Sequence, residues 1–232
     1  MNMQDSLRLA AILALSFVAA ACDGADDTVG GSTAQVPQQA VTEAARQVPM
    51  ALLAADLTTR SVALTSSGQC SDAVDLGGGL TANCVPFQNG VSFWVTGSPT
   101  SAPSCQVEIG INAFPGQGDA YEFTAQALES YIGCNQTNHY LAANGSVTAD
   151  ASGSVQSASA TMELLDRTWH STAQSLMLEQ PSAGFSLTLD FGTGTGPVKQ
   201  NGSTVATLTV SGGCTTVNFL DATLTDSTVC AW

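Results

Sequence analysis

Cysteine is the residue whose chemistry stands out in this 232-residue chain, which contains seven of them. A cysteine in an exported protein is expected to form a disulfide or to carry a covalent modification. Six of the seven lie in the body of the chain, and an even set predicts disulfides. We expect sequence neighbours to pair, because each such bridge closes a short loop. The expected disulfides are Cys70–Cys84, Cys105–Cys134 and Cys214–Cys230.

The seventh cysteine, Cys22, follows a leader of the kind that directs export. Arg8 precedes an apolar run over residues 9–15, and three alanines stand immediately before Cys22. This order is typical of a secretory signal peptide, here residues 1–21. The apolar run is too short for a membrane-spanning helix, which takes roughly 20 apolar residues.

Small residues directly before a cysteine resemble the lipobox of bacterial lipoproteins, although Ala19 stands where leucine is usual. The resemblance covers only the leader. It implies that the sulfur of Cys22 carries a diacylglyceryl group, and that the exported protein is anchored to the cell envelope at the inner or the outer membrane. Residues 22–33 would then be the lipidated cysteine and a flexible acidic tether. An ordinary cleaved signal peptide with a chance cysteine is the alternative.

The composition of the mature chain limits the classes of partner that it can bind. We expect this chain to form one β-rich domain over residues 34–232. The formal net charge is −14. Such a chain repels nucleic acid phosphates, so we expect no nucleic acid partner. No basic patch is available for anionic lipid, so membrane contact should come from the lipid on Cys22 alone. The cysteine spacing does not match structural zinc sites, and we expect no metal and no cofactor.

The elements that must position these residues begin with a helical segment. Residues 37–57 place apolar side chains at helical spacing, with Pro49 expected to kink or interrupt the segment. Two-residue alternation follows, which is typical of strands with one face in a core. Turn signals separate the strands, including Asn144-Gly145, Ser152-Gly153, Asn201-Gly202 and Ser211-Gly212-Gly213. The clearest alternating segments are 105–112, 120–127, 157–164, 185–191 and 204–210.

This pattern predicts a mainly β protein. The expected architecture is an antiparallel β-sandwich or a strongly curved sheet, with the N-terminal helix packed on it. Trp94 and Trp169 each share a strand face with polar residues. A tryptophan on such a face can be a platform for a sugar ring or a partner protein, or it can be covered by the helix.

The sequence contains no recognisable set of catalytic residues. A serine hydrolase needs a histidine oriented by a carboxylate, and neither His139 nor His170 lies in a recognisable motif. We therefore expect a lipid-anchored cell-envelope protein with a structural or binding role rather than an enzyme. Its partner would be a protein or a glycan. The alternatives are a secreted hydrolase and a carbohydrate-binding module.

Overall fold

The computed structural model describes residues 38–66, 73–180 and 183–231. The expected signal peptide over residues 1–21, Cys22 and the expected tether over residues 22–33 lie outside these ranges. The described part consists of one long helix, α2 (Gln38–Ser66), followed by strands as far as Cys230.

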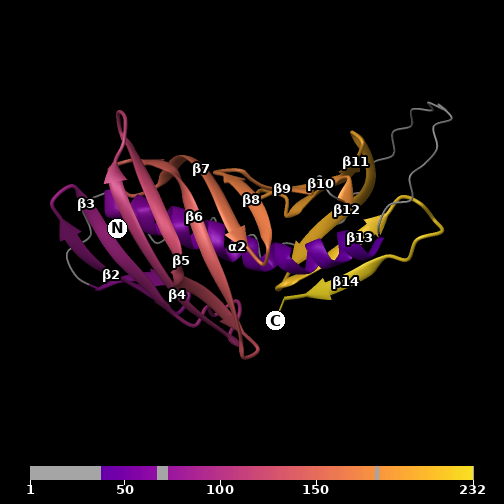
Figure 1. Cartoon of the computed structure of the whole chain (residues 1–232), viewed down its shortest axis with the longest axis horizontal. Helices are drawn as coiled ribbons and strands as arrows, with labels where there is room; N and C mark the ends of the chain where they lie inside the picture. The colour runs from indigo at the N-terminus through magenta and orange to yellow at the C-terminus, as the bar shows by residue number, and fades with distance from the viewer. Residues whose placement is uncertain (1–37, 67–72, 181–182, 232) are drawn as a thin grey trace.

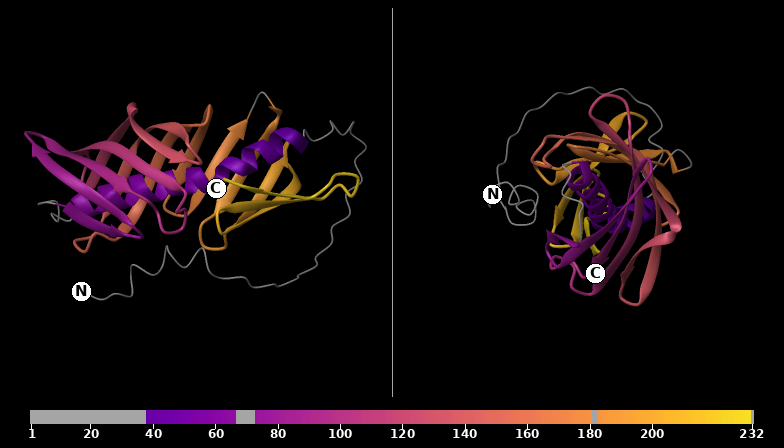
Figure 2. Two further views of the ribbon diagram at one scale, coloured as in Figure 1. Left: turned by 90° about the horizontal axis from the view of Figure 1, so that it is seen from below. Right: turned by 90° about the vertical axis from the view of Figure 1, so that its left-hand side faces the viewer.

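In the described residues the strands form one antiparallel sheet in which each strand pairs with the next along the chain. Figure 2 shows that this sheet bends strongly around the helix. The mainly β class with a packed N-terminal helix is thus confirmed, and the architecture is the curved sheet rather than the sandwich. The strands are β1 (Ala73–Gly77), β2 (Leu80–Phe87), β3 (Gly90–Gly97), β4 (Cys105–Pro115), β5 (Ala120–Cys134), β6 (Thr137–Ala149), β7 (Val155–Leu164), β8 (Arg167–Thr172), β9 (Ser175–Gln180), β10 (Phe185–Asp190), β11 (Thr195–Gln200), β12 (Ser203–Ser211), β13 (Cys214–Phe219) and β14 (Ser227–Cys230).

Helix α2 runs along the long axis of the molecule and crosses the strands (Figure 1). A helix of 29 residues is about 44 Å long. At its first turn the Nε2 of Gln38 donates to the Thr225 carbonyl near β14, at 2.7 Å. Near its other end, Nη1 of Arg60 donates to the Leu76 carbonyl of β1, at 2.8 Å. The helix therefore connects the two edges of the sheet.

The core lies between the helix and the inner, concave face of the sheet. Small and β-branched residues of α2, among them Val41, Ala44 and Val48, are completely buried. Alternate residues of the strands, such as Phe93 and Val95 of β3, are buried in the same core. Small helical side chains let the concave face of the sheet approach the helix closely, and this close packing leaves no room for water in the core.

Two expectations about local structure are wrong. The helix does not break at Pro49 but continues to Ser66, because residues on both sides of the proline are buried and hold the chain in place. Asn144-Gly145 is not a turn but part of β6. A Cβ atom on Gly145 would lie 2.3 Å from the Ser159 carbonyl oxygen, so glycine serves close packing between strands here. The other three turn signals do lie at the junctions between strands, with Ser211 as the last residue of β12.

Candidate functional site

The cysteines lie at matched positions on neighbouring strands. The structure contains the disulfides Cys105–Cys134, between β4 and β5, and Cys214–Cys230, between β13 and β14. Each joins residues that are direct cross-strand partners. Cys84 is also disulfide-bonded, while its expected partner Cys70 lies outside the described residues. Disulfides of this kind are expected in an oxidising compartment.

Trp169 does not lie on the surface. Its side chain is completely buried in the core, and its indole nitrogen has no hydrogen-bond partner. Arg167, two residues earlier on the same face, donates to the Gln180 side chain at 2.6 Å. It also interacts electrostatically with Glu43 on the helix. The face shared by Arg167 and Trp169 is therefore the inner one. Trp169 is covered, as the second reading of the sequence allowed, and cannot serve as a surface platform.

Trp94 is only partly buried, and it lies on the outer face of β3. Its cross-strand partner is Gly110 of β4, and a Cβ atom on Gly110 would come within 2.9 Å of the indole ring. The ring therefore lies directly over the glycine backbone. This arrangement supports the indole from below and leaves part of it open to solvent.

Ser130 holds the backbone beneath that ring. Ile109 pairs with Ser130 and Ile111 with Ala125, so β5 carries extra residues opposite Gly110. The Ser130 hydroxyl accepts from the Gly110 N–H and donates to the Gly110 carbonyl, both at 3.2 Å. The side chain thus provides the hydrogen bonds that the interrupted strand pairing leaves open.

Three further side chains continue the outer surface beside Trp94. Glu108 and Tyr131 are cross-strand partners, and Tyr131 pairs in turn with Tyr140. The Tyr131 hydroxyl donates to Glu108 Oε2 at 2.9 Å. This hydrogen bond to the carboxylate is the main reason that the pKa of Tyr131 is raised. Tyr140 is 58% exposed. We call Trp94, Glu108, Tyr131 and Tyr140 the aromatic patch.

A row of polar residues that includes no lysine, arginine or acidic side chain crosses the same face. Its members are direct partners on six successive strands, β3 to β8, and span about 24 Å at 4.8 Å per strand. Thr161 and His170 within it are hydrogen-bonded, Oγ1 to Nδ1, at 3.2 Å. We call this set the polar row, and it consists of Ser92, Asn112, Thr124, Asn144, Thr161 and His170.

The histidines are not arranged as in a hydrolase. His170 bonds the Thr161 hydroxyl rather than a carboxylate. His139 is partly buried, and burial lowers its pKa. Among the described residues, no carboxylate forms a hydrogen bond or ion pair with either imidazole. In the same residues, no group of three or more histidine, cysteine or acidic side chains could hold a metal ion.

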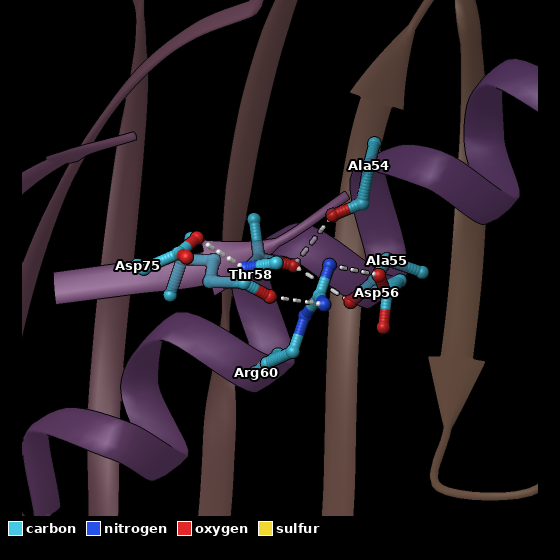
Figure 3. A network of polar contacts seen from close by, with 8 residues as sticks. Ala54, Ala55, Asp56, Thr58, Arg60 and Asp75 are labelled. Carbon is cyan, nitrogen blue, oxygen red and sulfur yellow. Dashed lines mark hydrogen bonds and ion pairs between the residues drawn. The ribbon is translucent and has the colours of Figure 1, made fainter. Parts of the chain in front are cut away.

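The polar cluster around Arg60 is structural. Figure 3 shows Arg60 on the helix with its guanidinium directed toward Asp56 and toward strand β1, which carries Asp75. Nη2 of Arg60 contacts Asp56 Oδ2 at 2.7 Å, while Nη1 donates to the Leu76 carbonyl. Burial raises the pKa of Asp56, and the charge and hydrogen bond of Arg60 oppose that rise. The cluster attaches edge strand β1 to the helix.

A shallow depression of about 200 Å³ lies at one end of β9, β10 and β11, with Glu179, Ser186 and Lys199 in its lining. It is wide open to solvent and has no buried charged group. We therefore regard the aromatic patch and the polar row as the better candidate site. Of its residues, the sequence predicts Trp94 as a possible binding residue and raises His170 only as a candidate for catalysis. It missed Tyr131 and Tyr140, whose only signal is that they occupy outward positions on long strands.

Comparison of the chain with protein-family models and with curated proteins gave no match. Within the described residues, no helix combines the length and the apolar character needed to cross a membrane.

Proposed function

We propose that the chain is a lipid-anchored cell-envelope protein that acts by binding through the outer face of its sheet. The binding role is supported by the difference between the two faces of the sheet. The inner face is closed by helix α2 and its apolar packing. The outer face carries Trp94 over Gly110, the exposed Tyr140, and hydrogen-bonding side chains in register.

The anchor rests on the sequence. Cys22 is the odd member of seven cysteines and directly follows three alanines. The disulfides Cys105–Cys134 and Cys214–Cys230 support an oxidising compartment outside the cytoplasm. A diacylglyceryl group alone would give a stable attachment, since each buried methylene contributes about 0.8 kcal/mol.

Intact-mass analysis of the protein from the membrane fraction tests the anchor. The expected product begins at a Cys22 that carries the added lipid mass. Cys22→Ser should move the protein into the soluble fraction, whereas the matched control Ser32→Ala, in the tether, should leave it in the membrane. An unmodified Cys22 at the mature N-terminus would contradict the anchor.

Co-sedimentation of the Cys22→Ser protein with washed envelope material tests the binding role. We expect a part of this unanchored protein to be retained, and Trp94→Ala with Tyr140→Ala to release it. Equal retention of both forms would show that the outer face is not the binding surface.

A further inference from the structure

The aromatic patch has a layout that restricts the class of ligand. Trp94 lies on β3 and Tyr140 on β6, three strand spacings or about 14 Å apart across the sheet. Tyr140 is in register with Glu108 and Thr96, so it is also offset from Trp94 by two residues along the strands. Both strands lie in the left half of Figure 1. Glu108 and Tyr131 stand between the two aromatic side chains and are already joined by a hydrogen bond. Their hydrogen bond fixes the centre of the patch, so little side-chain freedom is lost when a ligand binds.

A peptide strand is a poor occupant for this place. Peptides that add to sheets bind at an edge, where backbone N–H and C=O groups are free. Strands β3, β4, β5 and β6 are each paired on both sides. An occupant must therefore be recognised by side chains alone, lying across the strands rather than beside them.

Sugar rings match the side chains that are present. One face of a pyranose ring presents C–H groups and stacks on an aromatic ring, while the hydroxyls at its rim seek donors and acceptors. Asn112, Thr124 and Asn144 of the polar row offer both, and the Glu108 carboxylate is a strong acceptor. Because the surface is open, one sugar would lose only one face to the protein. An extended chain gains contacts at several rings.

Charge selects among glycans. The formal net charge of −14 disfavours polyanions, and the polar row contains no lysine or arginine. We propose that the aromatic patch and the polar row bind a neutral polysaccharide chain lying across β3 to β6. This inference rests on the proposed binding function and names its ligand class.

Affinity electrophoresis of the full chain in mild detergent tests the proposal. The gels contain a neutral polysaccharide (a soluble β-glucan, xyloglucan or dextran) or the polyanion alginate. We expect the wild type to be retarded by at least one neutral polymer. Trp94→Ala and Tyr140→Ala should each weaken the apparent affinity roughly tenfold, because exposed aromatic anchors carry much of the binding energy.

The matched control is Thr209→Ala. Thr209 is an exposed β12 residue flanked by Thr195 and Thr216 on neighbouring strands, distant in the sheet from the aromatic patch. It should bind like the wild type. Tyr140→Ala keeps the test decisive if loss of Trp94 weakens folding, since Tyr140 is mostly exposed.

Three outcomes would overturn the proposal: no retardation by any neutral polymer, retardation by alginate alone, or equal loss in Thr209→Ala and Tyr140→Ala. The electrophoresis could fail while Cys22 is lipidated and the outer face still retains the protein on envelope material. That combination would exclude a neutral polysaccharide as the ligand but would leave the proposed binding function in place. An unmodified Cys22 would remove the anchor without affecting the electrophoresis.

Discussion

At the scale of single residues, the contact between Trp94 and Gly110 links packing to the candidate function. The indole occupies the space that a Cβ atom on Gly110 would take, at 2.9 Å. We expect Gly110→Ala to displace the ring and to lower the free energy of unfolding by about 1–3 kcal/mol, the usual cost of overpacking. Urea unfolding and the tryptophan emission spectrum measure the two effects.

Gly192→Ala is the matched control for this change. A Cβ atom on Gly192 would meet only Oδ1 of Asp190, at 3.2 Å, an oxygen that accepts hydrogen bonds from Thr193 on the surface. This variant should lose less stability than Gly110→Ala and leave the tryptophan emission spectrum unchanged. If Gly110→Ala also left both stability and emission unchanged, the ring would not rest on the glycine.

The two tryptophans show how far residue-scale prediction reaches. Both share a strand face with polar neighbours, yet Trp94 is outside and Trp169 inside. Polarity marks the solvent face only where the inner face is apolar. Beside Trp169 the inner face carries Ser171, which is buried, and Arg167, whose partners Glu43 and Gln180 are remote in sequence. Nothing local in the sequence could reveal those partners.

At the scale of elements, the Arg60 cluster determines how firmly edge strand β1 is held. Arg60→Ala removes the bond to the Leu76 carbonyl and leaves the Asp56 carboxylate without its cation. Without Arg60 the pKa of Asp56 should rise further, because the two effects that lower it are gone. We expect a loss of about 1–3 kcal/mol at neutral pH.

The pH dependence of that loss follows from the sign of the shift. A carboxyl group with a raised pKa in the folded chain holds its proton better when folded than when unfolded. Stability linked to Asp56 is therefore fully present below its ordinary pKa of 3.8 and is lost as pH rises through the folded value. The deficit of Arg60→Ala should accordingly shrink in acid. Urea unfolding at several pH values measures it. Arg46→Ala, at an exposed position of α2, should show no such dependence, and a pH-independent deficit in Arg60→Ala would contradict the explanation.

Periodicity and turn chemistry could predict most of the elements. The alternating segments 105–112 and 157–164 lie within β4 and β7, and Asn201 and Gly202 form a turn with positive φ. The extra residues of β5 opposite Gly110 could not be predicted, because a register shift depends on the partner strand. For the same reason the turn expected at Asn144-Gly145 is not present. The dipeptide suits a turn, but strand pairing on both sides held it extended.

At the scale of the whole molecule, each strand pairs with the next strand in the sequence, so most strand contacts are local. Helix α2 is the element that connects strands far apart in the sheet. The helix contacts β13 and β14 as well as β3 to β7. A sheet whose edges do not meet is free to open unless something fixes its curvature, and here the helix supplies the apolar surface on which both halves close. The part of the sheet that contains β5 and β6 and the part that contains β12 and β13 should therefore unfold together.

Ala51→Glu tests this cooperativity, because Ala51 is completely buried near the middle of the helix. An uncompensated buried charge costs about 3–5 kcal/mol, a large part of the roughly 5–15 kcal/mol that stabilises a domain. Hydrogen exchange followed by mass spectrometry should show protection falling together in β5 and β6 and in β12 and β13. Gln39→Glu, which adds the same charge at an exposed position of the same helix, should leave both regions protected. Loss of protection in one half with full protection in the other would mean that the sheet consists of two independent units and that α2 does not couple them.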